Sequence, residues 1–133
     1  MTAPLRHHRA MLARMAPKAV PGDVVFCTTA DAARLAEALP HARAVMREAE
    51  GTTLVLPVET ARLLRYDTAL RMRQITLTVH SALEGVGLTA AVAAALAGAG
   101  IPCNVIAGFH HDHLFVPARR LNAALRRLKR LTR

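Results

Sequence analysis

Aromatic residues are scarce in this chain of 133 residues, which has no tryptophan, one tyrosine and three phenylalanines. A hydrophobic core must therefore be built from aliphatic side chains and alanine, and the hydrophobic content of 53% is ample for one. A chain of this length forms one compact domain or two very small ones. A transmembrane helix needs about 20 apolar residues. The most apolar segment, Leu88–Ala99, is too short, so no membrane association is expected.

Cysteine is also rare, with Cys27 and Cys103 each inside an apolar run that is typical of a strand. Buried free cysteines behave as small hydrophobic residues, whereas disulfides persist only in oxidising compartments. We expect two buried free thiols. The first fifteen residues, MTAPLRHHRAMLARM, lack the long apolar core of a signal peptide. The expected location is the cytoplasm.

Acidic residues are few, with nine against eighteen basic ones, which gives a net charge of +9. Sixteen of the basic residues are arginine and they are scattered, except in the last predicted helix. A scattered charge acts first on solubility and on the steering of encounters. Nucleic acid is therefore not the expected partner, although the basic last helix keeps an acidic partner or nucleic acid open as an alternative.

The segment from Arg73 to Pro117 has the clearest structural pattern. Ile75, Leu77 and Val79 alternate with polar residues, as in a half-buried strand. Small apolar residues up to Gly98 and Gly100 then predict a helix that ends there. The pattern predicts, in order, a strand, a glycine-bearing loop, a helix, two strands and a helix over residues 74–80, 81–87, 88–100, 105–109, 114–116 and 119–131. This βαββα order is the split-βαβ arrangement without its last strand.

The first half of the chain gives a weaker pattern. A short helix is expected over His7–Met15, followed by turns at Pro17 and Pro21-Gly22. The next elements are a strand, a helix with Thr29 as N-cap, and a short helix after Pro57, over residues 23–29, 31–39 and 58–64. Ala42–Glu48 is compatible with a helix or with the first arm of a hairpin. We favour the hairpin, because the strand Thr52–Leu56 needs a partner.

Three segments of the second half resemble the ACT domain: LTVHSALEGVGLTAAV from Leu77, GIPCNV from Gly100 and HDHLFVP from His111. More narrowly, they resemble small bacterial ACT-like proteins of unknown function that carry two such halves. The resemblance implies an α+β, ferredoxin-like fold, with an antiparallel sheet and helices on one face. It implies an ACT-like half over 69–133, preceded by a degenerate half over 1–68. Both halves end in an acidic turn, an apolar strand, a proline and a helix.

The second half ends in a helix where a fourth strand is expected, so its sheet would keep an open edge. Either a strand of the first half, such as Val24–Cys27, or a second chain could fill that edge. We therefore expect the halves to share a sheet or an interface, and the protein to be a homo-oligomer.

The loop Ser81–Gly87 is the first candidate site, because it leads into a helix N-terminus, where free N–H groups attract an anion such as a carboxylate. The alternative is that its glycines serve only packing. The resemblance places the effector of ACT domains at this loop, so the carboxylate of an amino acid would meet the backbone there. Its ammonium could meet Asp112 or Glu84. The alternatives are that Asp112 only forms a turn with its own backbone and that Glu84 is exposed to solvent. The predicted ligand-binding residues are Ser81, Leu83, Glu84, Gly85, Val86, Gly87, Leu88, Asn104, His111 and Asp112.

A histidine cluster, His110, His111 and His113 with Asp112, raises the alternative of a metal site with His80. Neighbouring residues of a strand point to opposite faces, so these side chains cannot converge on one ion without help. No metal or other cofactor is predicted. No nucleophile elbow or activated cysteine is present, so catalysis is not expected.

The sequence therefore predicts a non-catalytic ACT-like regulatory module. Its ligand would be a small molecule, an amino acid, bound at an interface between ACT units. The alternative is an interaction module without a ligand, which docks on an acidic partner or nucleic acid through its basic C-terminal helix.

Overall fold

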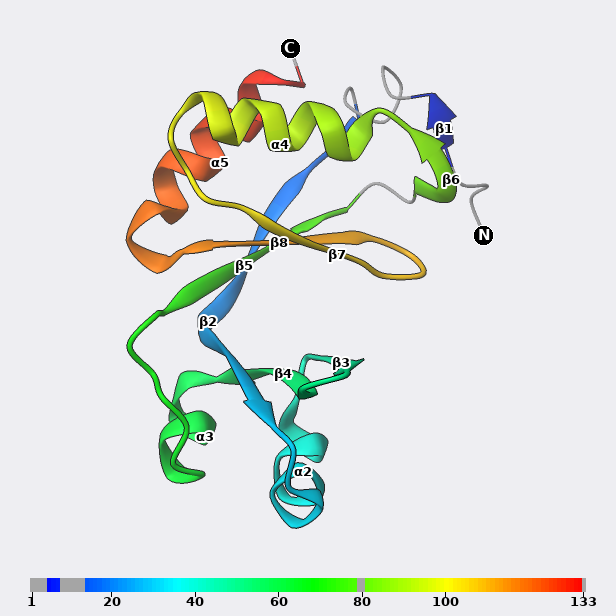
Figure 1. The fold of residues 1–133 in the computed structure, drawn as a ribbon. Coiled ribbons are helices and arrows are strands. Elements are labelled where there is room, and N and C mark those ends of the chain that lie inside the picture. The colour runs from blue at the N-terminus through cyan, green and yellow to red at the C-terminus, as the bar shows by residue number, and fades with distance from the viewer. Residues whose placement is uncertain (1–4, 8–13, 79–80, 133) are drawn as a thin grey trace. The chain divides into compact units, whose positions relative to one another are not determined.

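The computed structural model describes residues 5–7, 14–78 and 81–132, with only the backbone described for Leu5–His7 and Ser81–Val86 (Figure 1). Two compact units are present. The middle unit is Gly22–Met72, and the C-terminal unit combines Met1–Pro21 with Arg73–Arg133. The spatial units therefore differ from the consecutive halves 1–68 and 69–133, because the first residues of the chain group with its last sixty or so.

The middle unit contains a three-stranded antiparallel part of the sheet, in the order β3-β4-β2. Strand β4 pairs with β2 from Val24↔Pro57 to Thr29↔Thr52, and with β3 up to Glu48↔Gly51. The predicted hairpin is therefore confirmed. The elements are β2 (Pro17–Thr29), α2 (Ala32–Ala38), a 3-10 turn (Leu39–His41), β3 (Ala44–Glu48), β4 (Gly51–Pro57) and α3 (Val58–Leu63).

The core of the middle unit forms because alternate residues of β2 and β4 point to the side on which both helices lie. Val25 and Cys27 of β2 are buried with Leu54 and Leu56 of β4. The helices contribute the buried residues Ala38, Val58 and Ala61. Thr29 was predicted to cap α2, but the N-cap is Asp31, whose carboxylate accepts a hydrogen bond from the Arg34 N–H at 2.9 Å. An acceptor at the N-cap reaches the N–H three residues on.

The C-terminal unit contains the order β2-β5-β8-β7, with α4 and α5 on one side of these strands (Figure 1). Its elements are β5 (Met72–Leu77), β6 (Ser81–Val86), α4 (Leu88–Gly98), β7 (Asn104–Ala107), β8 (Asp112–Pro117), a 3-10 turn (Ala118–Arg120) and α5 (Leu121–Arg130). Strand β6 pairs in parallel with β1 (Leu5–His7). The predicted α+β, ferredoxin-like fold is confirmed.

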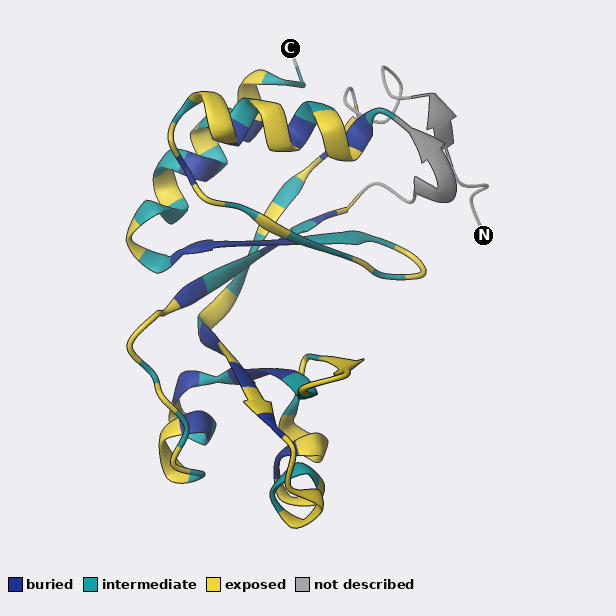
Figure 2. Ribbon diagram, viewed as in Figure 1, coloured by how far each residue is buried: buried dark blue, intermediate teal, exposed yellow. Residues whose placement is uncertain are grey.

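Apolar side chains from the sheet and from both helices form the core of this unit, which appears dark blue in Figure 2. The strands contribute Ile75, Leu77, Leu114 and Val116; α4 contributes Leu88, Val92 and Leu96; α5 contributes Ala124 and Leu128. Each fully buried aliphatic side chain stabilises the fold by about 1.5–3 kcal/mol. The core is aliphatic, as the scarcity of aromatic residues predicted.

The open edge of the second half is filled by the first part of β2. Strand β2 neighbours β5, and the Ala16 carbonyl accepts from the Thr78 N–H at 3.3 Å. The Arg73 guanidinium donates to the Val20 carbonyl at 3.0 Å. Val24–Cys27, which we expected at this edge, pairs with β4 instead. The partner strand of β5 was therefore predicted in the correct half of the chain, but it lies a few residues before Val24–Cys27.

Two other predictions need correction, and a third is largely untested. The loop predicted over Ser81–Gly87 is largely strand, because β6 runs from Ser81 to Val86 and pairs with β1. The turn predicted at Pro21-Gly22 lies inside β2, where Gly22 accommodates a φ of 91°. Most of the helix predicted over His7–Met15 lies outside the described residues, and His7 belongs to β1.

Helix α4 ends in a Schellman motif at a glycine. The Ile101 N–H donates to the Leu96 carbonyl at 3.0 Å, and the Gly100 N–H donates to the Ala97 carbonyl at 2.9 Å. The motif needs a left-handed residue, and Gly100 has a φ of 71°.

Helix α3 ends in the same motif with an arginine in the left-handed position. The Tyr66 N–H donates to the Ala61 carbonyl at 2.9 Å, and the Arg65 N–H donates to the Arg62 carbonyl at 3.1 Å. Arg65 has a φ of 64°. A non-glycine residue pays a conformational penalty in this conformation.

In the described part of the chain, every helix is too short or too polar to cross a membrane.

Candidate functional site

The start of α4 presents backbone donors that have no intrahelical acceptor. Gly87 is the N-cap, has a φ of 99° and is followed by an eleven-residue helix in which no side chain caps the first turn. The first helical hydrogen bond runs from the Ala91 N–H to the Gly87 carbonyl at 2.9 Å. The N–H groups of residues 88–90 therefore lack an intrahelical acceptor. Together with the positive end of the helix dipole, they can hold an anion.

Most residues of the predicted loop lie on β6 in this arrangement. Ser81, Leu83, Glu84, Gly85 and Val86 follow one another along the strand that enters Gly87, and the structure describes only their backbone. Leu88 is 3% exposed and belongs to the core. Its side chain therefore faces away from any ligand, although its backbone N–H belongs to the open first turn.

The β7–β8 hairpin separates the other predicted residues. Asn104 is paired with Phe115, whereas Asp112 is paired with Ala107. Three residues of strand correspond to about 10 Å. Since side chains alternate, Asn104 shares the face of Phe115 while Asp112 shares the face of Leu114. The hairpin therefore does not bring Asn104 and Asp112 together.

Asp112 lies at the end of the hairpin that is nearer the start of α4. Strand β7 returns along the sheet after α4, so its last residues run back toward the first turn of the helix (Figure 1). His111 closes the turn there, because its carbonyl accepts from the Gly108 N–H at 2.9 Å. A Cβ on Gly108 would lie 2.9 Å from that carbonyl oxygen, so the turn requires glycine.

A polar cluster on the sheet was missed by sequence reasoning. The Nδ1 atom of His113 lies 3.0 Å from the Thr76 hydroxyl and 3.2 Å from the Gln74 amide nitrogen. Burial lowers the pKa of His113, and the nearby His111 lowers it further. The alternation of β5 placed Gln74 and Thr76 on the polar face. Their histidine partner depends on the pairing of β5 with β8, which the sequence does not reveal.

The histidine cluster is engaged in other contacts. The His110 ring packs edge-on against Phe109 at 5.1 Å between ring centroids. Among the residues that the structure describes, no three His, Cys, Asp or Glu side chains are grouped as metal ligands would be. His80, the further ligand of the metal alternative, lies outside those residues.

Two arginines of the basic helix contact the C-terminal end of α4. Arg120 donates to the Ala99 carbonyl at 3.2 Å and approaches the Gly100 carbonyl at 3.5 Å. Arg127 donates through Nε to the Ala95 carbonyl at 3.2 Å. The last carbonyls of a helix need such partners, and cations there complement the helix dipole. These two side chains therefore support the fold.

Both cysteines are free thiols; Cys27 is buried, as predicted, whereas Cys103 is only partly buried. Burial raises the pKa of the Cys27 thiol, with smaller opposing effects of Arg34 and Asp67. Burial likewise raises the pKa of the Cys103 thiol. Neither has the lowered pKa that a reactive thiolate requires.

In both units a strand, a helix, two strands and a helix follow one another, with β6 inserted before α4 in the C-terminal unit. This order defines a ferredoxin-like α+β protein. Two family models described as ACT domain match the chain, one over residues 6–73 and one over 70–130. The chain belongs to the ACT domain family. No curated protein sequence gives a significant match.

Solved structures agree with this assignment. A Vibrio cholerae protein of unknown function, described as a possible transport protein, is 44% identical; the match covers 94% of this chain and 95% of that one, with a TM-score of 0.84. The regulatory subunit of aspartate kinase from Thermus thermophilus gives a TM-score of 0.66 at 12% identity and covers 89% of this chain and 98% of its own. A protein from Agrobacterium tumefaciens gives 0.66 at 16% identity, with 90% of each chain covered. At such low identity the last two share the fold.

Proposed function

We propose that this protein is a non-catalytic regulatory ACT module that binds a small amino acid at the start of α4. The observation that carries the proposal is the open first turn of α4, where the N-cap Gly87 leaves the N–H groups of residues 88–90 free of side-chain caps. The ligand carboxylate would accept from these N–H groups. Family membership supports a regulatory role.

The ligand ammonium needs an acidic partner near this turn. Asp112 begins β8 at the end of the hairpin that runs back toward the start of α4. Glu84 remains the alternative partner, on the strand that enters Gly87. Asn104 lies three residues further from the turn and on the other face, so we assign it no contact with the ammonium.

A second copy of the chain would close the site in this proposal. ACT-like modules signal when a ligand favours one packing of neighbouring units over another. The proposed homo-oligomer would supply that packing, and a separate partner would receive the signal. The matches over 6–73 and 70–130 support a tandem origin with halves near 1–68 and 69–133. The free thiols of Cys27 and Cys103 suit the reducing cytoplasm, where we place the protein.

The test is a thermal-shift screen against the twenty amino acids, followed by calorimetry on any hit. A ligand at about 100 times its dissociation constant should stabilise the fold by about 2.7 kcal/mol. Asp112→Ala should weaken the hit at least tenfold with an unchanged circular dichroism spectrum. Asn104→Ala is the matched control and should bind like the parent. Equal binding by both variants would remove Asp112 from the site, and no hit among the twenty would reject the amino-acid proposal.

The alternative function, docking on an acidic partner through α5, has fewer free cations than the sequence indicated. Arg120 and Arg127 already bind carbonyl groups of α4. Arg119, Arg126, Lys129 and Arg130 are exposed. Phosphate binding through four cations would weaken with salt with a logarithmic slope of roughly −4. A salt-independent partner would exclude this alternative.

A further inference from the structure

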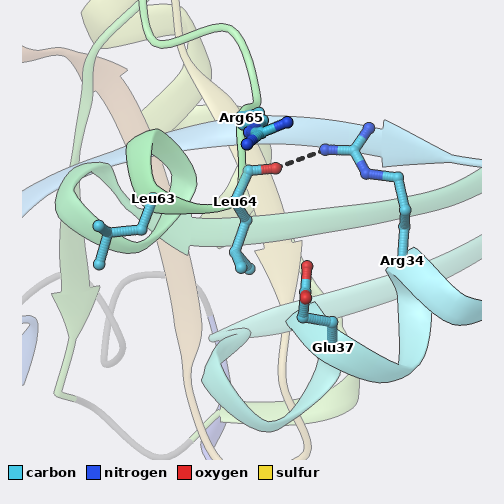
Figure 3. A pocket seen from close by; sticks show the side chains of 5 residues that line it. All are labelled: Arg34, Glu37, Leu63, Leu64 and Arg65. Atoms are coloured by element: carbon cyan, nitrogen blue, oxygen red, sulfur yellow. Dashed lines mark hydrogen bonds between the residues drawn. The ribbon is translucent and has the colours of Figure 1, made fainter.

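A hollow of about 550 Å³ lies in the middle unit, between α2 and the C-terminal end of α3 (Figure 3). Its lining combines two cations, one anion and two aliphatic side chains: Arg34, Arg65, Glu37, Leu63 and Leu64. This composition differs from the start of α4, and the two features belong to different units.

Arg34 is fixed in place before any ligand arrives. One terminal nitrogen of its guanidinium donates to the Leu64 carbonyl at 2.5 Å. The guanidinium carbon also lies 4.1 Å from the centroid of the Tyr66 ring, in a cation–π contact. A guanidinium has five N–H donors, so donors remain for a ligand. A side chain that is already ordered loses little entropy when it binds.

Arg65 reaches the same hollow from the strained end of α3. Arg65 lines the hollow together with Arg34 and Leu64 (Figure 3). Its backbone is left-handed, with a φ of 64°, at a position where α4 has Gly100. Strained residues that persist are concentrated at functional sites. The helix end itself does not explain why this residue is an arginine, because glycine would form the same motif at a lower conformational cost.

Glu37 supplies the opposite charge. It follows Arg34 by three residues on α2, so both side chains lie on one face of the helix. Figure 3 shows its carboxylate directed into the hollow. Among the described residues, it forms no ion pair with either arginine. One net positive charge remains in the hollow when these three side chains are ionised.

We propose that this hollow is a second binding site, for a small zwitterion with a carboxylate, an ammonium group and a short aliphatic part. The carboxylate would bind between Arg34 and Arg65, because guanidinium groups match carboxylates in geometry and charge. The ammonium would bind Glu37. The aliphatic part would cover Leu63, which is 81% exposed. This inference does not rest on the proposed site at α4.

Three compounds that share one branched alkyl group test the assignment by calorimetry. They are L-leucine, 4-methylpentanoate, which lacks the amino group, and 3-methylbutylamine, which lacks the carboxylate. L-leucine should bind the full chain most tightly. Arg65→Gln removes the charge and should weaken L-leucine and 4-methylpentanoate about tenfold each. Glu37→Gln should weaken L-leucine about tenfold and leave 4-methylpentanoate unchanged or tighter.

Two controls separate this site from the one at α4. Arg62→Gln removes an exposed cation of α3 outside the hollow and should leave all three affinities unchanged. In an Asp112→Ala background, which removes the proposed site at α4, Arg65→Gln should still weaken L-leucine and 4-methylpentanoate about tenfold each. The inference is overturned if no probe binds saturably, if Arg65→Gln and Glu37→Gln bind all probes like the parent, or if Asp112→Ala abolishes L-leucine binding.

Discussion

The left-handed residues that end α3 and α4 lead to two opposite predictions about stability. Both helices end with the same two hydrogen bonds, but Arg65 occupies the position in one and Gly100 in the other. A left-handed conformation costs an L-residue about 1–2 kcal/mol. Glycine avoids that cost but adds about 0.4–1 kcal/mol of entropy to the unfolded chain. Arg65→Gly should therefore stabilise the protein by about 0.5–1 kcal/mol.

Gly100→Ala is the matched change in the opposite direction. A Cβ on Gly100 would have no heavy atom within 4 Å, so its cost is conformational alone. We expect a loss of about 0.5–1 kcal/mol by the same balance. Urea unfolding followed by circular dichroism measures both changes, and 1 kcal/mol corresponds to roughly 4 °C in melting temperature for a chain of this size. A less stable Arg65→Gly variant would show that the arginine side chain contributes more than its strain costs. A neutral Gly100→Ala variant would refute the conformational argument.

Three further changes test the described contacts. Tyr66→Phe should raise the free energy of unfolding by about 1 kcal/mol, because the buried Tyr66 hydroxyl has no hydrogen-bond partner in the described structure; a loss of stability would mean that the hydroxyl has a partner, such as water. Arg127→Met should lower the free energy of unfolding by about 1 kcal/mol, because the hydrogen bond to the Ala95 carbonyl is lost while the apolar stem is kept. An unchanged denaturation midpoint would contradict this expectation. Burial lowers the pKa of His113, so the unfolded state binds its proton more readily and stability should fall as the pH drops through about 6.5. His113→Gln should reduce that fall, and an identical pH profile would exclude His113 as its source.

Elements with a local pattern could be predicted from the sequence. The β3–β4 hairpin was predicted from the Glu50-Gly51 turn and the β-branched run after it. The structure confirms the hairpin, but its turn is at Ala49 and Glu50, and Gly51 already pairs with Glu48. The helices over Leu88–Gly98 and Leu121–Arg130 followed from their small-residue and amphipathic patterns. In each case the deciding contacts lie within a few residues of one another.

Elements that depend on distant pairing could not be predicted in the same way. Ser81–Val86 contains glycine and has a loop-like composition, yet it is a strand because β1, more than seventy residues earlier, pairs with it. Pro21-Gly22 has the composition of a turn, yet β2 continues through it because β5 and β4 provide partners on its two parts. The start of α4 was predicted at the correct residue, and the binding site there stays a prediction. The separation of Asn104 from Asp112 required the register of the hairpin.

The arginines explain why net charge is a poor guide to the partners of this protein. Four of them donate to backbone carbonyl groups: Arg34 to Leu64, Arg73 to Val20, Arg120 to Ala99, and Arg127 to Ala95. A planar guanidinium suits this use better than an ammonium, because several fixed donors share one charge. Part of the +9 charge therefore completes the hydrogen bonding of helix ends and strands. Arg65 is different, because its backbone is strained and its side chain lines a hollow. The four carbonyl contacts therefore do not account for Arg65, and for this reason we proposed that it binds a ligand.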